Sequence, residues 1–187
     1  MAEIRKNPQP VKAIAALLAG RSEWLDAACE RLTEHLGPID IASETWPFTF
    51  THYYDDQMGP ELLRRLVSFE RLIDPGELAA IKQWTNALEA ELAPKTTDVP
   101  RPVNIDPGYV TSAKLVLASA KDFSHRIYLA DGIFAEVTLT FRRGRWESLP
   151  STFPDYASGL YDGFLNKARE GWKRQIHDAP GGDSTQA

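Results

Sequence analysis

The sequence predicts an α+β fold: a ferredoxin-like β-α-β-β-α-β core, extended by a C-terminal antiparallel β-meander and a final helix. Three observations support this prediction. Up to Ile105, strand-like and helix-like segments follow one another in the order of a ferredoxin-like unit. The run Asp74-Pro75-Gly76-Glu77 is a strong helix-start signal within this unit. The dipeptide Asp131-Gly132 separates two β-rich runs and favours a two-residue hairpin turn.

The first half of the chain supplies the six elements of the predicted core. Val11–Leu18 is apolar apart from Lys12 and predicts a buried central strand. Gly20 and Ser22 are expected to end this strand and to cap a helix. Its apolar residues recur at helical spacing until Gly37-Pro38, at Leu25, Ala28, Leu32 and Leu36. The remaining elements are strands at Ile39–Trp46 and Leu63–Leu72, a helix from Asp74 with the stripe Leu78, Ile81, Leu88 and Leu92, and a strand beginning at Val103–Ile105.

The second half is richer in β-structure. Ala113–Ser119 fits a strand or a helix, and we favour the strand. Three further strands are expected to form the meander, at Arg126–Ala130, Ile133–Phe141 and Trp146–Leu149. A final helix is predicted from a stripe of apolar residues at helical spacing, namely Leu160, Phe164, Ala168, Trp172 and Ile176.

The length of 187 residues fits one domain. We expect residues 11–178 to form it, with disordered segments at 1–10 and 179–187 and a loop at Pro94–Pro102. The single cysteine, Cys29, has no partner for an internal disulfide or a structural zinc site and is interpreted as a small buried hydrophobe.

The composition argues against two classes of partner. The formal net charge is −5, so the chain lacks the basic field that attracts nucleic acid or anionic membranes. No apolar run approaches the roughly 20 residues needed to cross a bilayer, and residues 1–10 do not resemble a secretion signal. We therefore expect a cytoplasmic protein that binds neither nucleic acid nor membrane.

The predicted hairpin brings a histidine and a glutamate together. With Asp131-Gly132 as the whole loop, Ile127 would face Glu136 and His125 would face Thr138. Alternation then places these side chains on one face of the sheet: His125, Ile127, Leu129, Phe134, Glu136 and Thr138. His125 and Glu136 would be diagonal neighbours, roughly 7–8 Å apart at the backbone, and would form an acid–base pair among apolar residues. The alternative is that the two residues only satisfy each other structurally.

The loop before this hairpin has the composition of an anion site. Lys121, Ser124 and Arg126 are expected to bind a phosphate or carboxylate, with Lys114 as a further cation; the alternative is a polar shoulder of the hairpin. Asp106, which we count with the catalytic candidates, and Tyr109 follow a predicted strand and would orient the substrate. In the alternative, Asp106 is only a turn residue before Pro107-Gly108. Tyr53 is the aromatic ligand-binding candidate.

Two further segments are interpreted more simply. His52 with Asp55 or Asp56 has the chemistry of a metal site, but the spacing fixes no further ligand, so no metal is assigned and the cofactor is left open. Phe153-Pro154-Asp155-Tyr156 is interpreted as a capping and packing turn before the last helix.

Several long strings of residues carry a family resemblance. They are Phe50-Thr51-His52-Tyr53-Tyr54 with Met58-Gly59, Val67 to Pro75, Thr85-Asn86-Leu88-Glu89, Asn104 to Tyr109, Lys121 to Tyr128, Ala135 to Thr138, and Phe153 to Tyr156. Through them, nearly the whole chain resembles the prokaryotic "domain of unknown function 4416" family. The resemblance implies no established activity. Some members carry the label GTP-binding protein, whereas this chain lacks the Gly-x-x-x-x-Gly-Lys-Ser/Thr phosphate loop.

These observations lead to two functional hypotheses. The first is an enzyme or binding protein for an anionic small molecule, phosphorylated or a nucleotide, in which Glu136 and His125 handle protons. The second is a non-catalytic interaction or regulatory module that uses exposed aromatic residues. Its candidates are Tyr53, Tyr54, Phe141, Trp146 and Tyr156.

Overall fold

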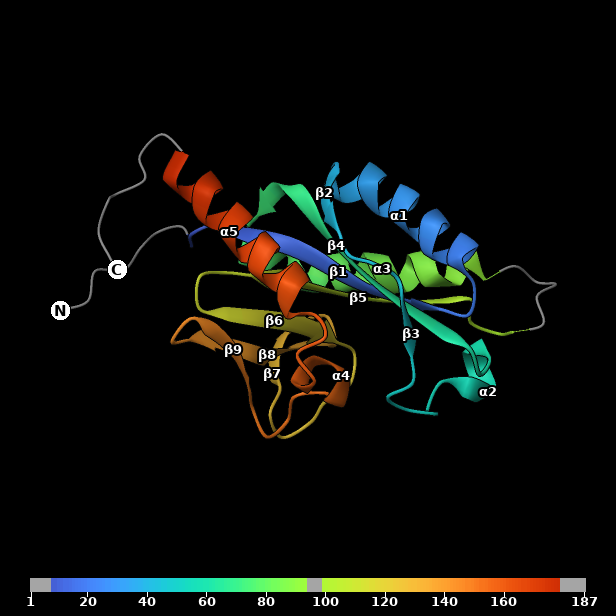
Figure 1. The fold of residues 1–187 in the computed structure, drawn as a ribbon. Helices are drawn as coiled ribbons and strands as arrows, with labels where there is room; N and C mark the ends of the chain where they lie inside the picture. Colours follow the sequence, from blue (N-terminus) through green and yellow to red (C-terminus); the bar gives the residue numbers. More distant parts are fainter. Residues whose placement is uncertain (1–7, 94–98, 179–187) are drawn as a thin grey trace.

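The computed structural model describes residues 8–93 and 99–178, so most of the segments predicted to be disordered (1–10 and 179–187) and part of the Pro94–Pro102 loop lie outside the described residues. The fold is α+β. Nine strands of the described chain form one antiparallel sheet in the order β2-β4-β1-β5-β6-β8-β7, with β3 beside β4 and β9 beside β8 (Figure 1). None of the described helices has the length and apolar character needed to cross a membrane.

Strand β1 (Val11–Ala19) is a fully buried strand in the interior of the sheet, as predicted. It lies between β4 (Leu62–Ile73) and β5 (Val103–Val110). Its alternate side chains pack against two helical layers, which explains why the run is continuously apolar. One face meets α1 (Ser22–Leu36) and α3 (Leu78–Leu92), and the other meets α5 (Asp162–Asp178), which crosses beside β1 in Figure 1.

The two helices of the first face begin differently. The predicted apolar stripe of α1 is buried, but its N-cap is Arg21, which makes no side-chain capping bond, so the prediction that Ser22 caps the helix is wrong. Before α3, the helix start predicted at Asp74 is confirmed as a capping box: Asp74 Oδ1 accepts from the Gly76 N–H at 2.7 Å, and Glu77 Oε1 accepts from the Asp74 N–H at 2.9 Å. The turn that follows, Pro75–Glu77, is a 3-10 turn.

The predicted strand Ile39–Trp46 is two short strands, β2 (Ile39–Ala42) and β3 (Trp46–Phe48), which both pair with β4. Ser43 lies between them, and its hydroxyl accepts from the Leu66 N–H at 2.9 Å. A side chain thus replaces a backbone partner of β4 at this point, and the strand is interrupted. The short helix α2 (Asp55–Met58) follows β3.

The predicted meander is present as β6 (Lys114–Ser119), β7 (Ile127–Ala130), β8 (Ile133–Arg142) and β9 (Arg145–Ser148). Asp131 and Gly132 have φ of 51° and 75°, as a type I′ turn requires. Helix α4 (Pro154–Ala157) precedes α5. Phe164, Ala168 and Trp172 of the predicted stripe are buried in α5, whereas Leu160 is exposed and precedes the helix.

The predicted register of the β7–β8 hairpin is wrong by one residue. Tyr128 pairs with Phe134 and Ile127 pairs with Ala135, because a bulge between Tyr128 and Ala130 makes Leu129 an extra residue. Ile127 therefore does not face Glu136, and its side chain is 73% exposed. Ile127 is therefore not one of the apolar neighbours of the Glu136 carboxylate.

The sheet is only narrowly joined between β5 and β6. Three residue pairs, Gly108 to Val110 with Leu117 to Leu115, hold these strands together. The first half of β5 is thus not paired with β6, and Lys82 of α3 fills part of this edge by donating from Nζ to the Ile105 carbonyl at 2.7 Å. The polar residues of the candidate site lie around this unpaired half of β5.

Candidate functional site

Arg64, Asp106 and Glu136 each belong to a polar cluster, and their side chains project to the sheet face opposite α1 and α3. Residues paired across an antiparallel ladder project to the same face. Leu18 pairs with Arg64, and Ala16 pairs with Asp106. Further along the face, Gly108 pairs with Leu117, which pairs with Glu136. Arg64, Asp106 and Glu136 therefore share one face of the sheet.

The Glu136 cluster consists of Ser119, Lys121, His125, Arg126 and Glu136. One carboxylate oxygen, Glu136 Oε2, lies 2.8 Å from His125 Nε2 and accepts from Arg126 Nε at 2.7 Å. The side chains of Glu136 and Arg126 are 3% and 6% exposed, and that of His125 is 30% exposed. The predicted proximity of His125 and Glu136 is therefore present, although His125 lies in the loop before β7 rather than in the ladder.

The guanidinium of Arg126 is hydrogen-bonded to other groups of the protein. Besides Glu136, its Nη1 donates to Ser119 Oγ at 2.8 Å and to the Lys121 carbonyl at 2.9 Å. Its guanidinium also lies 5.1 Å from the centre of the Phe123 ring. These contacts fix the loop 121–126, and they engage the guanidinium that we expected to hold an anion.

The same loop reaches the segment before α2. Lys121 Nζ donates to the Tyr53 hydroxyl at 2.9 Å and lies 4.7 Å from the centre of that ring. This hydrogen bond lowers the pKa of Tyr53. Ser124 is exposed in the intervening turn. Tyr53, Lys121 and Ser124 therefore lie on the exposed side of the Glu136 cluster.

Two predicted site residues are not brought to this place. Tyr109 lies three positions after Asp106, so it projects to the opposite face, where it packs against the apolar residues beneath α3. Burial raises the pKa of Tyr109. Lys114 is exposed at the far end of β6, where it pairs with Thr140. The expected contribution of both residues to one site with Glu136 is not supported by their positions.

The Asp106 cluster consists of Lys82, Glu89, Arg101, Asn104 and Asp106. Lys82 Nζ donates to Asp106 Oδ1 at 3.2 Å, and Asn104 Nδ2 donates to Oδ2 at 2.7 Å. Arg101 donates to Asn104 Oδ1 and to Glu89 Oε2, the latter at 2.6 Å. The Asp106 side chain remains 32% exposed. It is thus an oriented carboxylate that solvent can reach.

The two acids of this cluster respond differently to their surroundings. Burial alone would raise the pKa of Asp106, but Lys82, Arg64 and Asn104 outweigh it, so the pKa of Asp106 is lowered. Burial dominates at Glu89 and raises its pKa. Asp106 is therefore an ionised hydrogen-bond acceptor at neutral pH rather than a proton donor.

The Arg64 cluster consists of Arg64, Asp155, Tyr156 and Tyr161, and the sequence analysis missed it. Asp155 Oδ2 accepts from Tyr161 at 3.0 Å and from Arg64 Nη2 at 3.4 Å. All four residues are buried. One signal was available in the sequence: Arg64 alternates with Leu62 and Leu66, which puts a cation on an apolar face.

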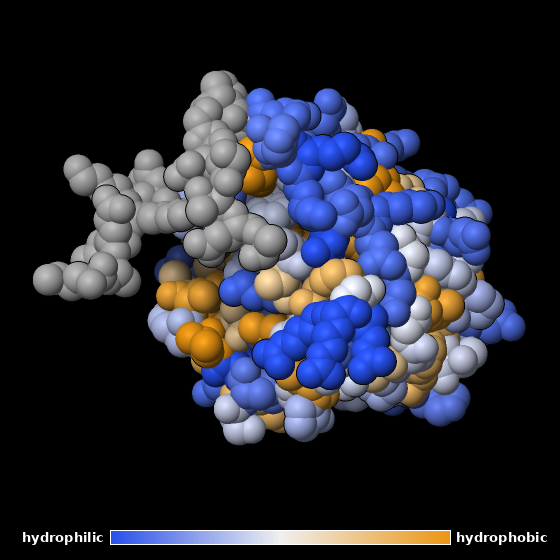
Figure 2. Space-filling view, turned by 60° about the vertical axis from the view of Figure 1, so that its left-hand side comes forward, coloured by the Kyte–Doolittle hydropathy of each residue, from blue (hydrophilic) through white to orange (hydrophobic). Residues whose placement is uncertain are grey.

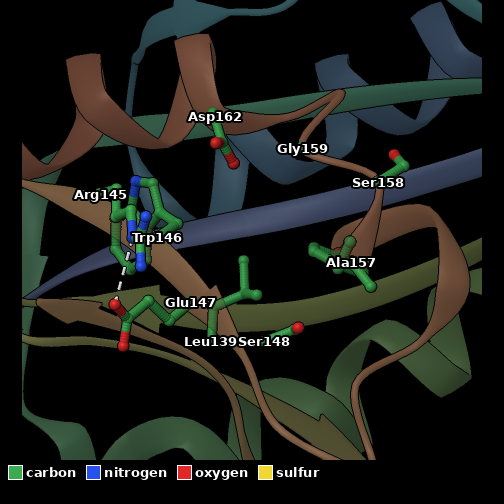
Figure 3. A pocket seen from close by; sticks show the side chains of 10 residues that line it. Leu139, Arg145, Trp146, Glu147, Ser148, Ala157, Ser158, Gly159 and Asp162 are labelled. Carbon is green, nitrogen blue, oxygen red and sulfur yellow. Dashed lines mark hydrogen bonds and ion pairs between the residues drawn. The ribbon is translucent and has the colours of Figure 1, made fainter.

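A pocket of about 560 Å³ opens beside this cluster, between β9 and the start of α5 (Figure 3). Tyr156 is one of its lining residues, as are Trp146 of β9 and Asp162 of α5. Burial raises the pKa of Asp162. None of the predicted catalytic or ligand-binding residues lines this pocket.

Metal-ligating side chains do not gather in the described part of the chain, where no group of three or more His, Cys, Asp or Glu side chains could hold a metal ion. His52 and Asp55 do meet, with Nδ1 and Oδ2 2.9 Å apart, but the histidine side chain is 93% exposed.

The family of the chain follows from a match over most of its length. The family model of a domain of unknown function, DUF4416, matches residues 9–172. The chain belongs to the DUF4416 family. All three polar clusters lie within the matched DUF4416 region, as does the pocket. A search of curated proteins gave no match.

The buried tyrosines of this DUF4416 protein predict a loss of stability at high pH. Burial raises the pKa of Tyr156 and of Tyr161 above the ordinary value. Both groups are neutral in the folded and unfolded chain below about pH 10, and only the unfolded chain ionises them just above it. Each of these two tyrosines should lower the free energy of unfolding by about 1.4 kcal/mol per pH unit above about pH 10.

Urea unfolding at a series of pH values would measure this loss. The slope should be shallower in Tyr156→Phe, which removes one of the two groups. An identical slope in this variant would contradict the assignment.

Proposed function

We propose that this protein binds a small anionic molecule on the sheet face that carries the three clusters, and that His125 and Glu136 move a proton there. The observation that carries the proposal is the sharing of one buried carboxylate oxygen by His125 and Arg126. Arg126 balances the charge of Glu136, and Glu136 orients the imidazole. His125, which is the most exposed of the three side chains, is then the group that a ligand meets.

The neighbouring clusters support a ligand with several polar groups. Asp106 presents an ionised oxygen, which suits a hydroxyl or amine of the ligand. Lys121 and Ser124 lie at the exposed edge and suit its anionic portion.

Three further predictions accompany this proposal. The order β2-β4-β1-β5, with α1 and α3 on one face, supports a ferredoxin-like arrangement of the first half. A cytoplasmic location stays a prediction from composition, as does the expectation that nucleic acid and membranes are not partners.

A second candidate is an interaction module, although its surface differs from the predicted one. Trp146 and Tyr156 are buried, and Phe141 packs edge-on against Trp146, its predicted cross-strand partner. The face in Figure 2 shows several separate hydrophobic patches among hydrophilic residues. The feature that favours this function is β7, an edge strand with exposed Ile127 and Tyr128, to which a partner's extended segment could add.

Thermal unfolding with candidate ligands tests the first proposal. A ligand at one hundred times its Kd adds about 2.7 kcal/mol and raises the Tm by roughly 5–10 °C. The panel should contain nucleotides, sugar phosphates, carboxylates and divalent metals. We expect a hit among the anions, and we expect His125→Gln to lose the shift while its ligand-free Tm stays within a few degrees of the parent.

His52→Gln is the matched control, because it also removes an imidazole from a carboxylate but at an exposed position. It should keep the full ligand shift. A His125→Gln variant that still responds like the parent would contradict the proposed role of His125, and a panel without hits would favour the interaction module.

A further inference from the structure

Arg64 carries hydrogen-bond donors that nothing in the described protein satisfies. Its Nε and Nη1 atoms are buried without a hydrogen-bond partner, and so is the hydroxyl of Tyr156. A guanidinium can only donate, so each of these nitrogens requires an acceptor atom. Buried polar groups without partners are rare in folded proteins, because each one costs the full desolvation of the group. Three such atoms in one cluster leave hydrogen-bonding capacity for a further group.

The charge of Arg64 is also incompletely balanced. Asp155 is its nearest acid, but the 3.4 Å separation is long for a charge-assisted hydrogen bond, which is typically about 2.7–2.9 Å. Asp155 is shared with Tyr161, and Asp106 is already bonded to Lys82 and Asn104. Burial raises the pKa of Asp155, although Arg64 opposes this. The guanidinium is thus left with a weak anionic partner.

The surroundings of Arg64 suit a small group that enters from one side. Phe48 covers the guanidinium, with its ring centre 4.7 Å away. Tyr54 and Asp106 lie close enough to Arg64 for the charge of its guanidinium to favour the ionised form of both. Both are partly exposed, in contrast to the buried Asp155, Tyr156 and Tyr161. The pocket of about 560 Å³ that Tyr156 helps to line is the opening beside this cluster.

We propose that Arg64 and Tyr156 bind an oxyanion group, a carboxylate or a phosphate, of a small ligand. Oxyanions supply several acceptor oxygens together with the missing negative charge. This inference rests on the proposed function, because it concerns the anionic end of the same ligand, and it moves that end from Lys121 and Ser124 to Arg64.

The sheet order gives the extent of such a ligand. Arg64 on β4 and Glu136 on β8 are four strand positions apart across the sheet. Arg64 is level with Asn104 of β5 and Glu136 is level with Gly108, so the two backbones are roughly 23 Å apart. The long side chains of Arg64 and His125 shorten this gap. A molecule that meets both is elongated, with its oxyanion at one end and Asp106 beside its middle.

The decisive variant is Tyr156→Phe, tested with sodium phosphate and sodium acetate as probes against sodium chloride at equal ionic strength. We expect phosphate or acetate to raise the Tm of the parent protein more than chloride does. Because the Tyr156 hydroxyl has no partner, its removal should leave the ligand-free Tm unchanged or slightly higher. Affinity for the effective oxyanion should fall about tenfold, as expected for losing one hydrogen bond to a charged group.

Tyr161→Phe is the matched control on the neighbouring ring, which lies 5.0 Å from Tyr156. Its hydroxyl donates to Asp155, so the ligand-free Tm should fall while the affinity for the oxyanion is retained. A response to phosphate alone or to acetate alone identifies the oxyanion, and either supports the proposal. It is overturned if neither anion exceeds chloride, or if Tyr156→Phe binds as tightly as the parent.

This experiment is separable from the test of His125. A metabolite response that His125→Gln loses but Tyr156→Phe keeps would refute the Arg64 site and leave the proposed function intact. If instead the oxyanion response depends on Tyr156 and no metabolite response depends on His125, the proposed role of His125 is refuted and the Arg64 site is supported.

Discussion

Gly108→Ala is expected to destabilise the protein by at least about 3 kcal/mol, because the added methyl group has no room. A Cβ atom at Gly108 would lie 2.2 Å from the Val116 carbonyl oxygen and 2.7 Å from Leu117 Cδ2. The first of these is a backbone atom, so relief requires β5 and β6 to separate. Only three residue pairs join these strands. Urea unfolding would measure the loss of free energy.

Gly163→Ala provides the control in the first turn of α5, where no atom other than those of the adjacent residues and of the helix's own backbone lies within 4 Å of the added Cβ. Alanine in a helix is favoured over glycine by roughly 0.5–1 kcal/mol, so this variant should be slightly more stable than the parent. If Gly108→Ala unfolds at the same urea concentration as the parent, the close approach of β5 and β6 is incorrect.

Glu136→Ala is expected to cost about 3–5 kcal/mol, because it leaves the buried guanidinium of Arg126 without its carboxylate. The Glu136 and Arg126 side chains are almost fully buried and their ion pair is 2.7 Å long. Denaturant unfolding would measure the loss. Glu147→Ala is the matched control, because it removes a carboxylate from an exposed partner, Arg145. Its effect should stay below about 1 kcal/mol.

Substitutions of Glu136 change the stability of the fold as well as the chemistry of the site. A Glu136 variant that loses ligand binding has an ambiguous meaning when the fold is also weakened, whereas His125→Gln removes only the more exposed partner. A Glu136→Ala protein as stable as the parent would show that Arg126 has other support and that the carboxylate is present for function alone.

The sequence predicted most of the elements, because their signals are local. The continuous apolar run of Val11–Leu18 and the capping residues Asp74 and Glu77 each act within a few positions of the chain. The bulge at Leu129 has no comparable local signal, so the predicted β7–β8 register failed. His125 still reaches Glu136, because it lies in the loop before β7, so its position does not depend on the register of the hairpin.

The candidate site was predicted only in part for a similar reason. Alternation along β5 would have separated Tyr109 from Asp106, since residues three apart project to opposite faces. The Arg64 cluster depends on contacts between β4 and the segment around α4, which are distant in sequence. No spacing rule connects Arg64 with Asp155 or Tyr156, so only the three-dimensional arrangement reveals them.

The central position of β1 has a consequence for the kinetics of folding. Lys12 pairs with Leu72 on one side and with Val110 on the other, so the middle of the sheet closes only after long loops have come together. Such non-local topology slows folding, whereas α1 and α3 form from nearby residues. Until β4 and β5 arrive, the most apolar strand of the chain is open to other chains, which makes aggregation the principal competitor of folding.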